Sequence, residues 1–150
     1  MILWLKSFLG LKYSMDNFIK EKSCGAVVYK FDNELMFLIL EHNSGHFSFP
    51  KGHVENDESE SETAIREIKE ETNIDVLLDT NFRFISTYSP KEGVIKDVIF
   101  FIAKAKTSDI VAQIEEIKSI NWYSYSDSLN ILTYDIDKEL LKKAYDYLGK

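Results

Sequence analysis

The chain has 150 residues, of which 45% are hydrophobic and 29% charged, and this composition is that of one ordinary soluble domain with a sizeable core. Its formal net charge of -7 argues against a protein that coats nucleic acid, and it favours an anionic substrate bridged by metal over one held by Lys and Arg alone. The single cysteine, Cys24, excludes an intramolecular disulfide and fits a reducing cytoplasm.

The first 14 residues are apolar but short, and they lack a basic N-terminal region and a small-residue cleavage site, so no secretory signal is expected. Three interpretations stay open for residues 1–14: an amphipathic helix packed on the domain, a weak membrane-surface segment, or an upstream start with Met15 as the functional start. We therefore divide the chain into an apolar extension, residues 1–14, and one domain, residues 15–150, and we expect no stable membrane association.

Three strands are predicted in the part of the chain that precedes Gly52. Residues 22–30 have a strand pattern, and the Asp-Asn pair at 32–33 supplies a turn into a second strand over residues 35–41. A short strand over residues 47–49 then leads into a loop that ends at Gly52. Glycine at that position permits a close approach of the backbone to a ligand, or a positive φ.

A helix is predicted from residue 59 to residue 72, with Asn73 at its C-terminal stop. Its apolar stripe consists of Ala64, Ile65 and Ile68. Glu67, Glu70 and Glu71 crowd one patch of its surface at spacings of three and four residues, where like charges repel. Several carboxylate oxygens in one place are what a hard cation such as Mg²⁺ needs, and the ion cancels their repulsion. The sequence therefore predicts a magnesium site on this helix.

The second half of the chain alternates extended and helical patterns. Strands are expected over residues 75–78, 83–88, 96–105 and 120–123, and helices over residues 127–132 and 137–148. The last helix is expected to turn Leu140, Leu141, Ala144, Tyr145 and Leu148 inward. Mixed strands with a central and a terminal helix predict an α/β fold, a sheet with helices packed on both sides.

The central loop and helix resemble the Nudix box of Nudix hydrolases. The matching positions are Gly52, Glu58, Arg66-Glu67-Ile68, Glu70-Glu71 and Asn73-Ile74, and only Asn73 departs, where the family usually has Gly. Asparagine supplies the same left-handed backbone conformation at modest strain. The match is specific, because charged residues at fixed spacing over a whole loop-helix unit do not arise from periodicity alone.

This resemblance covers most of residues 23–148 and implies the Nudix α/β/α sandwich, a mixed β-sheet flanked by the box helix and a C-terminal helix. It implies hydrolysis of a phosphoanhydride by a water activated by Mg²⁺, with Mn²⁺ as a possible substitute. The expected partner is a small nucleotide polyphosphate rather than DNA, and the expected form is a monomer in the cytoplasm.

The same resemblance implies roles for residues of the box. The expected catalytic set is Glu67, Glu70, Glu71, Glu116 and Arg66, and the expected metal ligands are Gly52 through its carbonyl, Glu67, Glu70, Glu71 and Glu116. Arg66 is expected to orient a glutamate through a bidentate pair, and Glu58 to brace the loop. Glu67 or Glu116 is the candidate general base, and a solvated surface position is the alternative for Glu116.

Three further segments, residues 23–26, 49–55 and 96–101, resemble the asymmetric diadenosine tetraphosphate hydrolase branch of the family. In that branch the substrate is cleaved to ATP and AMP. The resemblance implies three substrate-binding residues: Lys51 and Lys96 on the polyphosphate, and Tyr88 on a phosphate or stacked on a base. Phe47 is the fourth expected substrate-binding residue, placed with His46 at the mouth of the cleft. Packing of Tyr88 on the core is an equal alternative.

Other functions stay open. The chain could be a Nudix pyrophosphohydrolase that acts on nucleoside triphosphates or on triphosphorylated RNA 5′ ends, or a non-catalytic nucleotide-binding Nudix module, against which the complete acidic set argues. A calcium sensor is excluded by spacing, since no twelve-residue loop with alternating acids is present. The three histidines, His42, His46 and His53, lack the spacing of a zinc site.

Overall fold

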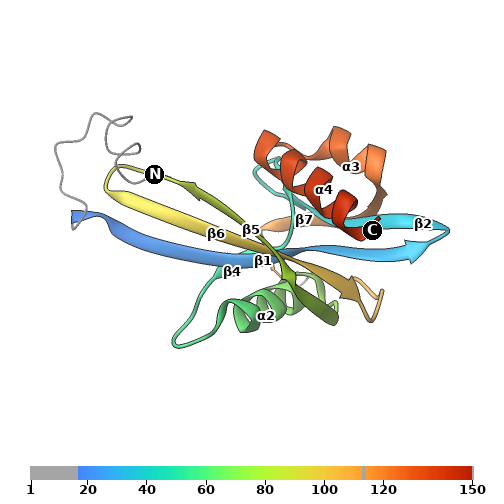
Figure 1. The fold of residues 1–150 in the computed structure, drawn as a ribbon, viewed down its shortest axis with the longest axis horizontal. Coiled ribbons are helices and arrows are strands. Elements are labelled where there is room, and N and C mark those ends of the chain that lie inside the picture. The colour runs from blue at the N-terminus through green and yellow to red at the C-terminus, as the bar shows by residue number, and fades with distance from the viewer. Residues whose placement is uncertain (1–16, 113, 150) are drawn as a thin grey trace.

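The computed structural model describes residues 17–112 and 114–149, so the expectations for residues 1–14 lie outside the described residues. Seven strands form one sheet, and helices pack on it (Figure 1). In chain order the elements are β1 (Ile19–Asp32), β2 (Glu34–His42), β3 (Phe47–Ser48), β4 (Lys51–His53), α2 (Glu60–Thr72), β5 (Val76–Tyr88), β6 (Val94–Ala105), β7 (Ile117–Ser124), α3 (Tyr125–Ile131) and α4 (Asp135–Leu148).

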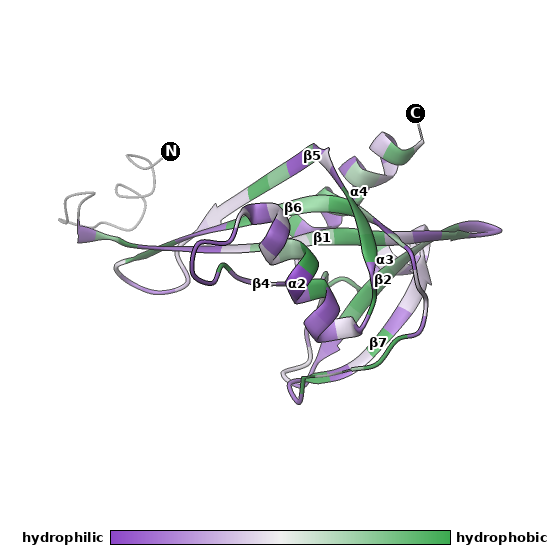
Figure 2. Ribbon diagram, turned by 90° about the horizontal axis from the view of Figure 1, so that it is seen from below, coloured by the Kyte–Doolittle hydropathy of each residue, from purple (hydrophilic) through white to green (hydrophobic). Residues whose placement is uncertain are grey.

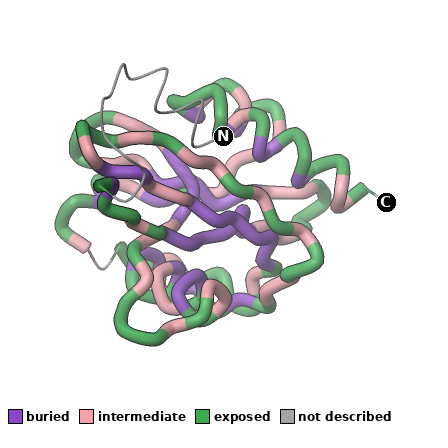
Figure 3. Tube along the Cα trace, turned by 60° about the vertical axis from the view of Figure 1, so that its left-hand side comes forward, coloured by how far each residue is buried: buried purple, intermediate pink, exposed green. Residues whose placement is uncertain are grey.

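The sheet is mixed, and β1 lies at its centre. The strand order is β3-β2-β1-β6-β5, with β4 paired to β1 and β7 paired to β2. Strands β1 and β6 are parallel, whereas the other pairs are antiparallel. The middle of β1, Ser23–Val28, is buried at every residue, because both faces of the sheet are covered at this point (Figure 3).

The two faces of the sheet hold two separate clusters of buried residues. Ala64 and Ile68 of α2 pack on one face, over strand residues such as Cys24. Leu140, Leu141 and Ala144 of α4 pack on the other face, over strand residues such as Val27. Hydrophobic residues run through the middle of β1 and β6 between these layers (Figure 2). The α/β/α sandwich with a mixed sheet is therefore confirmed, and Cys24 is an ordinary core thiol.

Helix α2 begins and ends where the sequence indicates. The Ser59 hydroxyl accepts a hydrogen bond from the Glu62 amide, and the Glu62 side chain accepts one from the Ser59 amide, which completes a capping box. Asn73 closes the helix in the left-handed conformation with φ of 68°. Its inward face differs from the expected stripe: Ile65 is 43% exposed, while Glu71 is buried beside the core.

Several strand and helix boundaries also differ from expectation. Lys51–His53 is a short strand paired to β1 rather than a loop, because its backbone completes hydrogen bonds at that edge. The two segments expected over residues 75–78 and 83–88 are one strand, β5, with a register irregularity between Asp79 and Phe84. None of the helices within residues 17–112 and 114–149 is long and apolar enough to span a membrane.

The inward face of α4 is narrower than the sequence suggested. Tyr145 is 38% exposed, because its ring stacks on Tyr125 of α3 with centroids 3.8 Å apart instead of entering the core. Leu148 is partly buried against the same cluster. The three remaining expected residues are fully buried.

Two isoleucines of α2 provide a matched test of this packing. Ile68→Ala should lower the free energy of unfolding by about 2 to 4 kcal/mol, because it removes a fully buried side chain and leaves a cavity between α2 and the sheet. Ile65→Ala, on the exposed side of the same helix, should change it by less than about 1 kcal/mol. Urea denaturation of both variants measures the difference. Equal losses of unfolding free energy would contradict the inward face of α2 that the structure shows.

Candidate active site

Strand β4 brings the loop and helix of the box into contact. The Lys51 amide donates a hydrogen bond of 3.0 Å to Oε1 of Glu71, across twenty residues of sequence. Gly52, the next residue, faces the Glu67 carboxylate so closely that a Cβ atom there would overlap it. Glycine at this position is thus required by the close approach of a side chain rather than by a positive φ.

Arg66 holds the acidic groups of the box together. Its Nε and Nη2 atoms donate to Oε2 and Oε1 of Glu58 at 2.6 and 2.9 Å, a bidentate pair. Its Nη1 atom donates to Glu67 at 2.9 Å and to Glu70 at 3.1 Å, and Nη2 also reaches the His53 carbonyl at 2.9 Å. One guanidinium therefore fixes the loop before α2 and two of the three clustered glutamates.

The carboxyl groups of the box have different electrostatic environments. Hydrogen bonds from Arg66, and then from the Glu55 amide, lower the pKa of Glu58 to about 2. Burial raises the pKa of Glu71 to about 8, and the charge of Glu67 adds to this effect. Burial also raises the pKa of Glu67, although Arg66 opposes the shift. Glu71 is thus the carboxyl group that most lacks a cation.

The donor set fits a hard cation, although the side chains are not gathered around one. Among the described residues, no three His, Cys, Asp or Glu side chains form a group that could hold a metal ion. Arg66 donates hydrogen bonds to Glu67 and Glu70, and the Lys51 amide donates one to Glu71. Oxygen ligands of this kind suit Mg²⁺, and a cation would offset the burial and the repulsion by Glu67 that together raise the pKa of Glu71.

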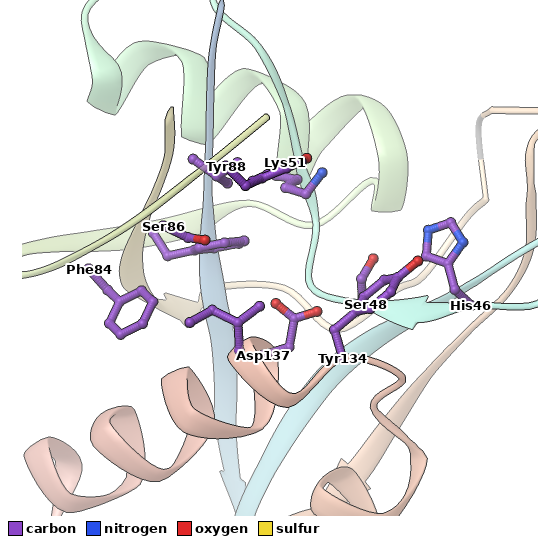
Figure 4. A pocket seen from close by; sticks show the side chains of 11 residues that line it. His46, Ser48, Lys51, Phe84, Ser86, Tyr88, Tyr134 and Asp137 are labelled. Carbon is purple, nitrogen blue, oxygen red and sulfur yellow. The ribbon is translucent and has the colours of Figure 1, made fainter. Parts of the chain in front are cut away.

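A cavity of about 600 Å³ lies beside the box, on the α4 face of the sheet (Figure 4). Its lining combines aromatic, apolar and polar side chains: His46, Ser48, Lys51, Phe84, Ser86, Tyr88, Val98, Phe100, Tyr134, Ile136 and Asp137. Lys51 and Tyr88 lie on the side toward α2, whereas Asp137 extends from the first turn of α4 on the opposite side. The volume and the aromatic walls suit a nucleoside-sized ligand.

Two lysines give this cavity a positive edge. Lys51 lines it directly, whereas Lys96 is not among the lining residues and lies opposite the lining residue Tyr88 across β5 and β6. Burial lowers the pKa of Lys96, and the nearby charge of Lys51 lowers it further. Tyr88 is 42% exposed and lines the cavity, so the alternative in which it packs in the core is wrong.

Two expected site residues lie apart from this cavity. Phe47 is not among the lining residues; its ring is partly buried against the cluster beneath α3 and α4, and its neighbours His46 and Ser48 line the cavity instead. Glu116 is exposed at the turn before β7, where its carbonyl accepts a hydrogen bond of 2.8 Å from the Asn43 amide. Its role in the site stays a prediction.

The histidines near the cavity support its wall. The rings of His42 and His46 stack with centroids 4.0 Å apart. His42 shares a hydrogen bond of 2.8 Å with the Ser48 hydroxyl, and burial lowers its pKa to about 4. Burial also lowers the pKa of His46, so both rings are neutral near pH 7, and His46 gives the cavity wall a polar but uncharged side chain.

Sequence reasoning missed the contribution of α4. Tyr134 and Asp137, at the start of this helix, both line the cavity. The available signal was Asp137 itself, an acidic residue at a position that the helical pattern of residues 137–148 assigns to the buried face. Phe84 and Ser86 of β5 were also missed. They lie two residues apart on the same face of the strand as Tyr88, and all three side chains line the cavity.

Comparisons with known proteins agree with this geometry. The NUDIX domain model matches residues 20–144. A bis(5′-nucleosyl)-tetraphosphatase [asymmetrical] from Caenorhabditis elegans is 32% identical over 134 residues, which is 85% of this chain and 96% of that protein. The Rattus norvegicus protein of the same name is 28% identical over 140 residues, 85% of this chain and 95% of its own length. A crystal structure of a C. elegans Ap4A hydrolase binary complex has a TM-score of 0.78 at 29% identity, covering 86% of this chain and 98% of that one.

The raised pKa of Glu71 makes a prediction about stability and pH. Because its folded pKa of about 8 lies above its ordinary value of 4.5, folding is favoured most below pH 4.5, and this contribution is lost as the pH rises through 8. In EDTA at pH 9, Glu71→Gln should therefore be more stable than the unaltered protein by more than about 1 kcal/mol. The amide oxygen keeps an acceptor for the Lys51 amide.

Urea denaturation at pH 4.5 and pH 9 measures this difference. Glu139→Gln serves as the control, because it also replaces one glutamate by glutamine but at an exposed position on α4. It should leave the pH dependence of the free energy of unfolding unaltered. Equal stability of Glu71→Gln and the unaltered protein at pH 9 would show that Glu71 carries no buried charge.

Proposed function

The chain belongs to the NUDIX family and is a hydrolase of phosphoanhydride bonds, and we propose that its substrate is diadenosine tetraphosphate, which it cleaves to ATP and AMP. The observation that carries this proposal is the double position of Lys51. Its amide holds Glu71 of the acidic helix, and its side chain lines the cavity. A bound nucleotide in the cavity would therefore have its phosphates next to the acidic cluster.

The relatives support the choice of substrate. This chain spans 95% and 96% of the length of the two tetraphosphatases, so no large part of those proteins is missing from it. The structural likeness to the C. elegans Ap4A hydrolase extends over 98% of that chain. Similarity over a whole domain is stronger support than similarity of a motif alone, because the cavity walls come from strands and helices outside the box.

We assign the metal-holding role to Glu67, Glu70, Glu71 and the Gly52 carbonyl, with Mg²⁺ as the ion and Mn²⁺ as a substitute. When bound, the ion would neutralise negative charge on the phosphates and lower the pKa of the water molecule that it holds. Glu116 is a further candidate ligand through its exposed carboxylate. The chemical fit rests on the buried, cation-poor position of Glu71 and on the close approach of the Glu67 carboxylate to Gly52.

The remaining roles belong to residues of the chain itself. Glu67 has a raised pKa and a fixed position on Arg66, which suits it to accept a proton from the attacking water, with Glu116 as the alternative base. Arg66 is a positioning residue, because all its contacts are with groups of the box.

Substrate binding is assigned to the cavity and its positive edge. Lys51 and Lys96 attract the polyphosphate through their positive charges. Tyr88 stacks on a base, with Tyr134 on the other side of the cavity as a second aromatic wall. Phe47 supports this wall from the core. We further propose that the protein works as a cytoplasmic monomer on small nucleotides rather than on DNA.

Product chromatography tests the proposed substrate. With Mg²⁺, diadenosine tetraphosphate should yield ATP and AMP in equal amounts, faster than any nucleoside triphosphate or triphosphorylated RNA is cleaved. Glu71→Gln should lower the rate by at least about 100-fold and keep the circular dichroism spectrum, because the amide cannot supply the negative charge that a cation requires.

The other outcomes separate the alternatives. Faster release of pyrophosphate from a nucleoside triphosphate, or from RNA 5′ ends, would keep the hydrolase and discard the dinucleotide. Absence of turnover on every substrate, with nucleotide still bound, would indicate a non-catalytic module. Full activity of Glu71→Gln would remove Glu71 from the metal site.

Tyr88 gives a second test of the cavity. Tyr88→Ala should lower kcat/KM for diadenosine tetraphosphate by about 5- to 150-fold, mainly through KM, because loss of a stacked base costs about 1 to 3 kcal/mol. Tyr88→Phe keeps the ring and should retain most of the activity. Steady-state kinetics distinguish the two variants, and an unchanged KM for Tyr88→Ala would place the base elsewhere.

A further inference from the structure

Asp137 is a buried carboxyl group that the proposed chemistry does not use. It lies in the first turn of α4, is 9% exposed, and lines the cavity. Its carboxylate oxygens point from the helix into the cavity (Figure 4). From the residues that the structure describes, no hydrogen bond or ion pair reaches this carboxylate, and the N-terminus of α4 has no side-chain cap.

Stability does not explain a charged group at this position. Burial raises the pKa of Asp137 to about 6, and the charge of Lys51 only partly opposes the shift. A buried carboxylate without a donor destabilises the fold. The favourable interaction of an acid with the helix dipole is already available from Asp135, which lies in the same turn and is exposed. A ligand that brings N–H donors would remove the cost.

The surroundings of Asp137 specify the shape of that ligand. Tyr88 and Tyr134 contribute aromatic rings to the cavity that Asp137 also lines. Burial raises the pKa of Tyr88, and the charges of Tyr134, Glu21 and Asp137 add to this effect. A flat base placed against these rings would turn one edge toward α4. The carboxylate then meets the hydrogen-bonding edge of the base rather than its face.

The chemistry of a carboxylate distinguishes the purines. An ionised carboxylate only accepts hydrogen bonds, and its two oxygens match two adjacent donors. Guanine presents such a pair, N1–H and N2–H. Adenine presents one amino donor beside N1, which is itself an acceptor and would face the second oxygen unfavourably. Asp137 therefore complements guanine better than adenine.

We propose that Asp137 is a specificity-determining residue that binds the N1–H and N2–H edge of guanine, so that the cavity prefers guanine to adenine nucleotides. This inference rests on the proposed function for the position of the nucleotide in the cavity, and it extends the substrate class to guanosine-containing dinucleoside tetraphosphates. Diadenosine tetraphosphate remains a substrate, bound with one hydrogen bond fewer at this edge.

Binding calorimetry tests the proposal without catalysis. GTP and ATP are titrated into the full chain at pH 8 in EDTA, where Asp137 is ionised. The unaltered protein should bind GTP at least about 5-fold more tightly than ATP, the effect of one bidentate pair. Asp137→Asn should reverse the preference, because an amide both accepts and donates and so pairs with the edge of adenine.

Asp135→Asn is the matched control. It removes the same charge from the same helical turn, but from an exposed position, so the ratio of GTP to ATP affinity should not change. Equal affinities of the unaltered protein for the two nucleotides would overturn the proposal. So would a loss of affinity in Asp137→Asn that is equal for both, because a structural or purely electrostatic role has that effect.

A mixed substrate gives an independent reading on the unaltered protein. Asymmetric hydrolysis of adenosine guanosine tetraphosphate yields either ATP with GMP or GTP with AMP, depending on which base occupies the cavity. A preference for guanine makes one product pair dominate, and Asp137→Asn should shift the ratio toward the other pair. An even ratio of the two product pairs would overturn the proposed role of Asp137 but leave the proposed hydrolysis standing. Absence of cleavage would contradict the proposed hydrolysis, and the calorimetry of GTP and ATP would then test Asp137 by itself.

Discussion

The close contact between strand β4 and helix α2 is the constraint on which the site depends. Two glycines make it possible: a Cβ at Gly25 of β1 would overlap the backbone of the segment at residues 50–51, and one at Gly52 would overlap the Glu67 carboxylate. With both side chains absent, β1, β4 and α2 approach closely enough for the Lys51 amide to reach Glu71. A larger residue at Gly25 would push residues 50–51 away from β1, whereas one at Gly52 would displace the Glu67 carboxylate.

That contact concentrates negative charge, and a single arginine controls most of it. Arg66 contacts Glu58, Glu67 and Glu70, and these hydrogen bonds raise its own pKa above the ordinary value. Glu71 lies beyond its reach in a buried position and depends on one backbone amide. The protein thus pairs three glutamates with one arginine and leaves a fourth, Glu71, in need of a cation. The cluster is consistent with function rather than with stability.

The sheet separates the acidic group from the groups that line the cavity. Helix α2 carries the carboxylates on one face, and α4 brings Tyr134 and Asp137 to the other face. Lys51 joins the two sides because its backbone faces α2 while its side chain enters the cavity. Substitutions on α4 can therefore alter which nucleotide the cavity binds without moving the carboxylates of the box.

The sequence alone determined the features that depend on local interactions. Helix α2 was predicted with its Ser59 start and Asn73 end because caps and periodicity act within a few residues, and the resemblance of the box to Nudix hydrolases followed from fixed spacing. A bidentate pair of Arg66 with a glutamate was also expected, and the structure identifies Glu58, in the same loop-helix unit, as that glutamate.

Only the tertiary structure decided which faces are buried and which residues form the cavity. The Phe47 amide donates a hydrogen bond to the Thr133 hydroxyl across 86 residues, and it is His46 and Ser48 rather than Phe47 that line the cavity. Glu71 is buried and Ile65 exposed because the position of β4 selects the inward face of α2. Asp137 meets Tyr88 only after β5 and α4 have packed on one sheet face. Such long-range contacts leave no periodic signal in the sequence.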